Sequence, residues 1–402
     1  MPYAIDKQHT LDLVGGSAEN EFDVGAHAAS RTVHVARATS GTIKLGTWPL
    51  ASDGTFTGTG AEVVVGQGTR TRIVVFDNHR IVVVWIDASG SLRARGYNTG
   101  GDFAGPPVAV ETLIADFDIV SVGVTTGVQH GNPHDSVYYA YRNFAFTTLS
   151  ANGGWKFWFG TVTDSCEVTV GPVAAGGPGD KVALSCASVN ETINGTHPRK
   201  AFTLWRDAGQ IKTQSWRAAG AGVTSLASAA ETKALGVGIV YGMSAAQGND
   251  MFATVVWPGA SNATARLQLV SLDAGGAMSV YGSTEIAEIP RSLARLQYYG
   301  GDAAVAYMTP EGHLGVAAWR FAAPGSADTT RTVLAAKVGT EQPTQVRLAS
   351  LVPTSDSDAD PVQLVTLSRV AAGLLRLVSW RLHKTFIFSP IGPTPIGHVT
   401  KG

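Results

Sequence analysis

An eight-residue pattern recurs along the chain, and its spacing constrains the fold more than any other feature of the sequence. The clear copies read glycine, any residue, an aliphatic residue, four more residues and then tryptophan. They are GTIKLGTW, GQIKTQSW, GHLGVAAW and GLLRLVSW, which begin at Gly41, Gly209, Gly312 and Gly373. Degenerate copies begin at Gly90, Trp155 and Ala265, so successive copies start 49, 65, 54, 56, 47 and 61 residues apart. Repeats of this length indicate seven similar structural units.

Each unit carries the signature of a β-hairpin. A segment rich in valine, threonine and aromatic residues precedes the octet, such as RTVHVARATS before Gly41 and RIVVVWIDAS before Gly90. Its alternation of apolar and polar residues predicts a strand. The leading glycine of the octet closes the hairpin, because a positive φ costs glycine little. A more polar strand follows, and a short apolar strand such as TRIVVFD begins the next unit.

Four strands in each of seven units predict an all-β fold, a seven-bladed β-propeller with about four antiparallel strands per blade. A β-helix would need shorter rungs, and a pair of β-sandwiches would not explain seven octets in one register. One large aromatic side chain per blade can fill the space between neighbouring twisted sheets. We assign this packing role, rather than contact with a ligand, to Trp48, Trp216, Trp319 and Trp380.

A single propeller domain is expected over residues 1–402. The blades are predicted at roughly residues 20–66, 67–114, 115–178, 179–234, 235–290, 291–340 and 341–402. Residues 1–19 are a candidate ring-closing strand, because HTLDLVGG could add the outer strand of the last blade; TFIFSPIG near the C-terminus is the alternative. Either closure would remove two exposed sheet edges.

The whole chain resembles the superfamily of repeat-built bacterial β-propellers in this octet and in the strands around it. It lacks the Ser-x-Asp-x-Gly-x-x-Trp boxes of sialidases and the Gly-His and Trp-Asp signature of WD repeats. It also lacks a clear Tyr-Trp-Thr-Asp pattern of low-density-lipoprotein-receptor propellers. The resemblance therefore implies the propeller fold and carries no catalytic residue with it.

Charge and composition disfavour several classes of function. The formal net charge is −1 and no basic stripe occurs, so nucleic acid is not expected as a partner. No window approaches the roughly 18 consecutive apolar residues of a membrane helix, so membrane insertion is not expected. The N-terminus lacks the pattern of a signal peptide, which favours a cytoplasmic or non-classically exported protein. The two cysteines, Cys166 and Cys186, are expected to be buried thiols rather than a bridge.

The segments predicted to join the first and second strands of the units are often long and polar. They read FDNHR, TGVQHGNPHDS, ASVNETINGTHPRK, GMSAAQGND, YGGD and VPTSDSDADP. In a propeller these loops all emerge on one face around the central channel, and loops on a rigid scaffold are common places for binding groups. The candidate ligand-binding residues of this face are His79, His130, Asn132, His134, Asp135, Glu191, His197 and Asp250.

Two groups in these loops have the composition of metal sites. His130 and His134 are four residues apart and could share a metal with His197. The segment DSDAD resembles the start of a calcium loop, although the glycine and the closing glutamate of an EF-hand are missing. Its acidic residues are Asp356, Asp358 and Asp360. Calcium or another divalent metal is therefore a candidate cofactor, and solvated polar loops are the alternative explanation.

Three kinds of function remain open. The first is a binding module whose polar face receives a glycan, a small molecule or a protein. It is favoured because no Gly-x-Ser-x-Gly elbow and no phosphate-binding loop is found. The second is an enzyme of hydrolase, lyase or cyclase type that uses the histidine and aspartate residues of the same face. The third is a scaffold within a larger assembly, with the rim of the propeller as its interface.

Overall fold

The computed structural model shows an all-β protein. It describes residues 3–15, 21–76, 79–101, 104–128, 138–185, 200–218, 227–237, 244–247, 252–258, 264–272, 277–280, 284–295, 302–321, 331–351 and 362–384. The described strands, β1 to β30, form seven sheets that we number in chain order. Within the described residues, no helix has the length and hydropathy needed to cross a membrane.

The first four sheets follow one another along the chain. Sheet 1 contains β2 (Phe22–His27), β3 (Thr32–Thr39), β4 (Thr42–Pro49) and β5 (Ala61–Gln67). Sheet 2 contains β6 (Thr71–Phe76), β7 (Arg80–Ile86), β8 (Leu92–Asn98) and β9 (Val108–Glu111). Sheet 3 contains β10 (Ile114–Val128), β11 (Tyr138–Ser150), β12 (Gly154–Val162), β13 (Val168–Val170) and β14 (Ala174–Pro178). Sheet 4 contains β15 (Lys181–Ser185), β16 (Lys200–Asp207), β17 (Gln210–Ala218) and β18 (Ala227–Val237).

The last three sheets include the two ends of the described chain. Sheet 5 contains β19 (Ser244–Gln247), β20 (Phe252–Pro258), β21 (Ala265–Leu272), β22 (Met278–Val280) and β23 (Thr284–Ile286). Sheet 6 contains β24 (Ile289–Arg295), β25 (Asp302–Met308), β26 (Leu314–Phe321) and β27 (Arg331–Val338). Sheet 7 contains β28 (Gln345–Leu351), β29 (Val362–Ala371), β30 (Leu374–Lys384) and β1 (Tyr3–Val14).

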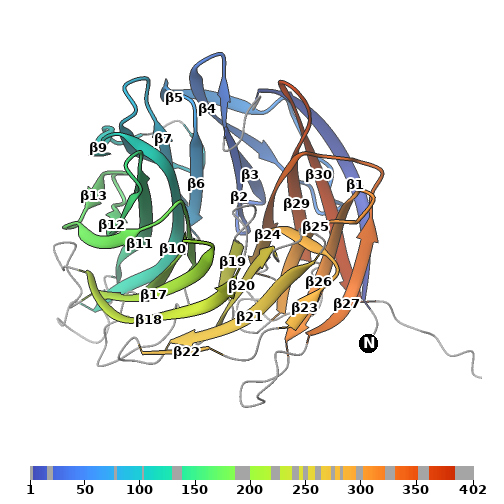
Figure 1. Ribbon diagram of the computed structural model, residues 1–402. Coiled ribbons are helices and arrows are strands. Elements are labelled where there is room, and N and C mark those ends of the chain that lie inside the picture. Colours follow the sequence, from blue (N-terminus) through green and yellow to red (C-terminus); the bar gives the residue numbers. More distant parts are fainter. Residues whose placement is uncertain are drawn as a thin grey trace, which may run out of the picture.

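The sheets are arranged around a common axis, with the first strand of each sheet innermost. These inner strands contact one another in the order β2, β6, β10, β15, β19, β24 and β28, and β28 returns to β2. Figure 1 shows β2, β19 and β24 near the middle of the ring and the later strands of each sheet towards its rim. This arrangement confirms the prediction of an all-β propeller.

The second strands explain why the sequence reads as apolar runs in the middle of each unit. In β7, Ile81, Val82, Val83, Val84 and Trp85 are all buried. Successive side chains of a strand point to opposite faces, so both faces of β7 are covered by neighbouring sheets. The third strand alternates more strongly, and in β8 the two arginines are only partly buried.

The repeated octet has the structural roles predicted for it. The clear copies and the copy at Gly90 begin with a glycine of positive φ, between 72° and 83°, in the turn between the second and third strands. The tryptophans of the clear copies are at most 3% exposed. Trp216 stacks on Phe157 of the preceding sheet, with ring centroids 4.6 Å apart and an interplanar angle of 1°. Packing between sheets is therefore confirmed for this tryptophan, and Trp48, Trp319 and Trp380 likewise belong to clusters that join neighbouring sheets.

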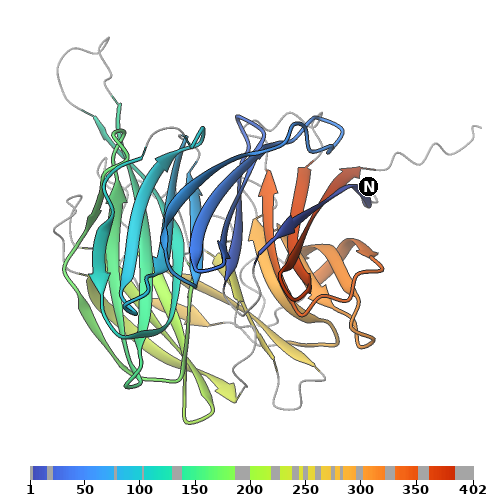
Figure 2. The same cartoon turned by 90° about the horizontal axis from the view of Figure 1, so that it is seen from above.

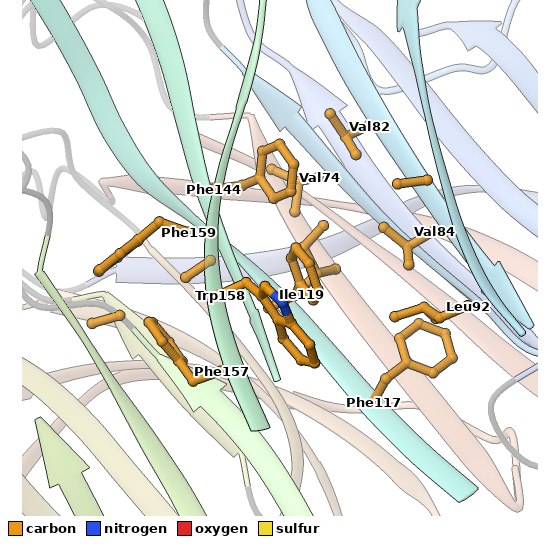
Figure 3. Packing of buried hydrophobic residues seen from close by; sticks show 14 of the residues in the cluster. Val74, Val82, Val84, Leu92, Phe117, Ile119, Phe144, Phe157, Trp158 and Phe159 are labelled. Carbon is orange, nitrogen blue, oxygen red and sulfur yellow. The ribbon is translucent and has the colours of Figure 1, made fainter. Parts of the chain in front are cut away.

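The hydrophobic core is divided among the interfaces between sheets. The largest cluster joins sheets 2, 3 and 4. Figure 3 shows Val82, Val84 and Leu92 of sheet 2 facing Phe117 and Ile119 of sheet 3. Trp155 and Trp158 are 2% and 4% exposed and belong to this cluster, so their rings pack in the core and are not available for stacking on a ligand.

The N-terminal strand completes sheet 7. Strand β1 pairs antiparallel with β30, from Tyr3 opposite Lys384 to Val14 opposite Leu374. Figure 2 shows the dark blue β1 beside the red β30. The alternative segment TFIFSPIG lies outside the described residues.

Two local features differ from the sequence prediction. The segment GMSAAQGND was predicted as a loop, but β19 (Ser244–Gln247) lies within it and takes the innermost position of sheet 5. Pairing with β20 in the ring outweighs the weak strand propensity of its residues. In sheets 3 and 5, the expected single fourth strand is divided into two short strands that pair with the same third strand.

Candidate functional site

The predicted polar face can be compared with the structure at one of its proposed residues. His79 is described and lies in the turn between β6 and β7, next to the end of an inner strand. The other proposed ligand and metal residues lie outside the described part of the chain, so their grouping stays a prediction. They are His130, Asn132, His134, Asp135, Glu191, His197, Asp250, Asp356, Asp358 and Asp360. Among the described residues, no group of three or more His, Cys, Asp or Glu side chains could hold a metal ion.

His79 is exposed and has an unusual backbone conformation. Its φ of 61° lies in the left-handed region, which histidine tolerates better than most residues. Its carbonyl oxygen accepts a hydrogen bond of 3.1 Å from the backbone N–H of Thr99, and its Nδ1 lies 3.3 Å from Oγ1 of Thr99. The turn of sheet 1 has the same frame, because Arg31 has a φ of 50° and its carbonyl accepts from the N–H of Leu50. The scaffold therefore repeats here, while the side chains differ.

The ring of His79 lies on a second, buried histidine. The ring centroids of His79 and His27 are 4.4 Å apart, with an interplanar angle of 52°. His27 is the last residue of β2 and is 1% exposed. Since the inner strands β2 and β6 are neighbours in the ring, the ends of both strands bring these two imidazoles together. The pair lies at the ends of the inner strands where the sequence places the polar face.

A chain of hydroxyl groups connects His27 to a third histidine in sheet 1. Nδ1 of His27 lies 2.6 Å from Oγ of Ser30, which is 2.7 Å from Oγ1 of Thr32. Oγ1 of Thr32 lies 2.9 Å from Nε2 of His34, and Nδ1 of His34 lies 3.0 Å from Oγ1 of Thr47. His34 is 0% exposed. Both ring nitrogens of this buried imidazole are thus satisfied by hydroxyl groups.

The hydrogen bonds of this chain have one consistent direction. The backbone N–H of Ser30 donates to Nδ1 of His27 at 3.1 Å, so this nitrogen carries no proton and the Ser30 hydroxyl also donates to it. The hydroxyl of Thr32 then donates to Ser30, and Nε2–H of His34 donates to Thr32. Nδ1 of His34 accepts from the hydroxyl of Thr47. The network therefore fixes both tautomers and places the proton of His27 on Nε2.

The buried imidazole of His34 is uncharged. Burial, with a smaller contribution from His27, lowers the pKa of His34 to about 3. His34 is consequently neutral at physiological pH and unsuited to general base catalysis, which needs a pKa near the working pH and contact with the substrate. The arrangement can orient hydrogen-bond donors and acceptors at the surface of sheets 1 and 2.

His79 was predicted from its loop as a ligand-binding residue, whereas His27 and His34 were not predicted. Both occur in the segment HAASRTVH, where a histidine ends the first strand and another lies inside the second strand. His34 interrupts the apolar run of the second strand, and a polar residue inside such a run is the sequence signal that could have indicated it. The contact with His79 could not be derived from this signal, since it depends on how sheets 1 and 2 are placed.

The comparisons with known proteins concern the fold. No protein-family model and no curated protein matches the chain. The SapL1 lectin in complex with alpha methyl fucoside is similar, with 11% identity and a TM-score of 0.45 over 79% of this chain and 96% of that chain. A lectin from Aleuria aurantia, described as a six-bladed β-propeller with fucose recognition, has 10% identity and a TM-score of 0.44 over 78% and 95%. BBS1N in complex with ARL6DN has 10% identity and a TM-score of 0.49 over 94% and 97%.

Proposed function

We propose that this protein is a ligand-binding β-propeller that presents one polar face around its axis, with His79 and His27 at a binding site for a hydroxyl-rich ligand such as a glycan. The observation that carries the proposal is the exposed ring of His79, held in a left-handed turn against the buried ring of His27. Non-glycine residues in this conformation are often found at functional positions.

Comparison with the matching turn of sheet 1 favours a ligand-binding role for His79 over a role in holding sheets together. Arg31 occupies the corresponding position and donates to the carbonyl oxygens of Leu50 and Ala51 and to Oε1 of Gln363. The hydrogen bond to Gln363, which lies in β29, ties sheet 1 to sheet 7. His79 is instead an exposed side chain that contacts His27 and Thr99. The same turn geometry therefore holds a side chain that joins two sheets at Arg31 and an exposed side chain at His79.

The chemistry of the site favours a neutral polar ligand. Imidazole and hydroxyl groups supply directional donors and acceptors, which discriminate between ligand hydroxyl groups, and an exposed ring offers a flat surface for packing. The candidate residues from His130 to Asp250 follow the ends of the inner strands β10, β15 and β19, so the topology favours their joining the same face. A small molecule or a protein with a polar surface is the alternative ligand.

A glycan array tests this function directly. Labelled wild-type protein is applied to printed oligosaccharides, with alpha methyl fucoside among the soluble competitors, and any hit is measured by calorimetry. His79→Ala should weaken the affinity about tenfold or more, as expected for the loss of one hydrogen-bonding ligand contact. The matched control is His313→Ala, because His313 lies in a turn between second and third strands, on the opposite face. No bound glycan, or an unchanged affinity of His79→Ala, would contradict the proposal.

We also propose that each of the seven sheets is one blade of a single domain, as the sequence repeat predicts, with residues 1–19 closing the ring. The closed order of inner strands and the pairing of β1 with β30 support this blade number. The Aleuria aurantia lectin is described as six-bladed, so this chain would have one blade more than that relative in fold. An experimental density map viewed along the axis would count the blades.

A further inference from the structure

The turn that carries His79 is joined to sheet 3 by the side chain of Arg80, the first residue of β7. Nη1 of Arg80 donates a hydrogen bond of 2.9 Å to the carbonyl oxygen of His79. Nε and Nη2 both donate to the carbonyl oxygen of Asp164, at 3.1 and 2.6 Å. Asp164 lies in the turn between β12 and β13. One guanidinium group therefore joins the backbones of two neighbouring sheets.

The turn of sheet 3 that receives these hydrogen bonds, residues 163–167, is closed on itself and packed against sheet 2. The backbone N–H of Cys166 donates to the carbonyl oxygen of Thr163 at 3.0 Å. The carbonyl oxygen of Cys166 occupies the space that a Cβ atom would need at Gly96 and at Gly105 of sheet 2. This turn is therefore a firm support for the guanidinium group.

The carbonyl oxygen of His79 accepts two hydrogen bonds. One comes from Arg80, and the other, of 3.1 Å, comes from the backbone N–H of Thr99 just after β8. Both lone pairs of this oxygen are thus used. A left-handed conformation of a residue other than glycine persists only where the surrounding structure compensates for its cost. The two donors restrain the peptide group that follows His79 and so hold the backbone from which the imidazole projects.

The turn of sheet 1 distributes these roles differently. There the left-handed residue is itself an arginine, Arg31, and its guanidinium group reaches Gln363 of sheet 7. In sheet 2 the left-handed residue is His79, and the arginine that connects two sheets comes one position later. Sheet 2 thus keeps an arginine that connects sheets and places an exposed imidazole at the left-handed position.

We propose that Arg80 is a positioning residue of the proposed binding site and acts on the ligand only through His79. The ring of His79 lies on His27 of sheet 1, and its carbonyl oxygen is connected through Arg80 to sheet 3. The site is therefore located where three sheets meet. Residues that contact a ligand bind it well only when other side chains hold them in the productive geometry. This inference rests on the proposed function for the role of His79, but the position of the ring can be measured without a ligand.

NMR spectroscopy of the ligand-free protein, isotope-labelled in its histidines, tests the positioning. Rings with centroids 4.4 Å apart should give nuclear Overhauser effects between His27 and His79. In Arg80→Gln these effects should be weakened or lost, and the amide hydrogen of Thr99 should exchange about tenfold faster or more, because its acceptor is no longer held. If Arg80→Gln does not fold, Arg80→Lys keeps the charge without the planar fork and should give the same changes.

Arg70→Gln is the matched control, because Arg70 also joins sheets 2 and 3. Its guanidinium group donates to the carbonyl oxygen of Ala115. Arg70 precedes β6 and His79 follows it, so the 6 residues of this strand place the control about 20 Å away. Arg70→Gln should leave the contact between the two imidazoles and the exchange of Thr99 as they are in the wild type. Equal changes in Arg70→Gln and Arg80→Gln would attribute them to looser packing of the two sheets and would overturn the inference.

Binding to a glycan found on the array gives an independent test. Arg80→Gln should weaken the affinity about three- to tenfold, and the double variant His79→Ala with Arg80→Gln should bind no more weakly than His79→Ala alone. A residue that acts through the imidazole has no effect once the imidazole is removed. Additive losses would show that Arg80 contacts the ligand itself and would overturn the inference.

The two proposals fail in different ways. If Arg80→Gln keeps the imidazole contact and the slow exchange of Thr99, the positioning role is wrong even when a glycan binds. If no glycan binds to the wild type, the proposed function is wrong, and the NMR measurements still decide whether Arg80 holds the His79 turn.

Discussion

Acid should destabilise this protein through one residue, the buried His34. Its pKa is lowered to about 3 in the folded chain, mainly by burial, whereas an unperturbed histidine has a pKa of about 6.5. The folded state therefore disfavours the protonated imidazole. The stability that His34 contributes is fully present above pH 6.5 and is lost progressively as the pH falls from about 6.5 towards 3.

The size of the effect follows from the two pKa values. Between about pH 7 and about pH 4.5, protonation of His34 in the unfolded chain should lower the free energy of unfolding by about 2.5 kcal/mol. At pH 4.5 this figure depends almost entirely on the ordinary pKa, since the folded protein still holds a neutral imidazole there. His34 is 0% exposed, so screening by solvent should not reduce the effect.

Urea unfolding at the two pH values isolates this residue. His34→Gln should be less stable than the wild type at pH 7, because the side chain cannot satisfy both Thr32 and Thr47 in the same geometry. Its further loss between pH 7 and pH 4.5 should be smaller than that of the wild type by about 2.5 kcal/mol. The variant and the wild type share all their other titratable groups. The difference between their losses of stability in acid therefore reports His34 alone, as in a double-mutant cycle.

The control is a destabilising substitution that removes no titratable group. Val365→Ala, in the core between sheets 7 and 1, should lower stability at both pH values and keep the acid dependence of the wild type. If His34→Gln loses as much stability in acid as the wild type, His34 is not held neutral in the folded protein. The directed hydrogen-bond chain from Thr47 to His27 would then be wrong too.

Two further predictions concern the ring closure and the candidate metals. Removing residues 1–15 should lower the melting temperature, because β1 buries Ile5 and Leu13 and the burial of each side chain stabilises the fold by about 1.5–3 kcal/mol. An unchanged melting temperature would assign the closing strand to TFIFSPIG. Metal analysis of the purified protein should show a bound divalent ion, and one of two triple variants should lose it. One variant combines His130→Ala, His134→Ala and His197→Ala, and the other combines Asp356→Asn, Asp358→Asn and Asp360→Asn. Protein that contains no metal, or that keeps its metal in both sets, would leave these loops as solvated polar segments.

The predictable part of the structure is the part that each repeat encodes locally. The octet glycines could be placed in turns because their positive φ is a local requirement that few other residues meet. The tryptophans could be assigned to packing because one large apolar side chain recurs in every clear copy. Neither inference needed to know which sheets are neighbours.

The unpredictable part depends on contacts between sheets. His27 and His79 belong to different sheets, and only the order of the inner strands brings their rings to 4.4 Å. Asp23 and Arg347 are at opposite ends of the chain and meet because the ring closes. Strand β19 was hidden in an apparent loop because its residues have little strand propensity of their own. Propensity and periodicity describe single strands, so they carry no information on such contacts.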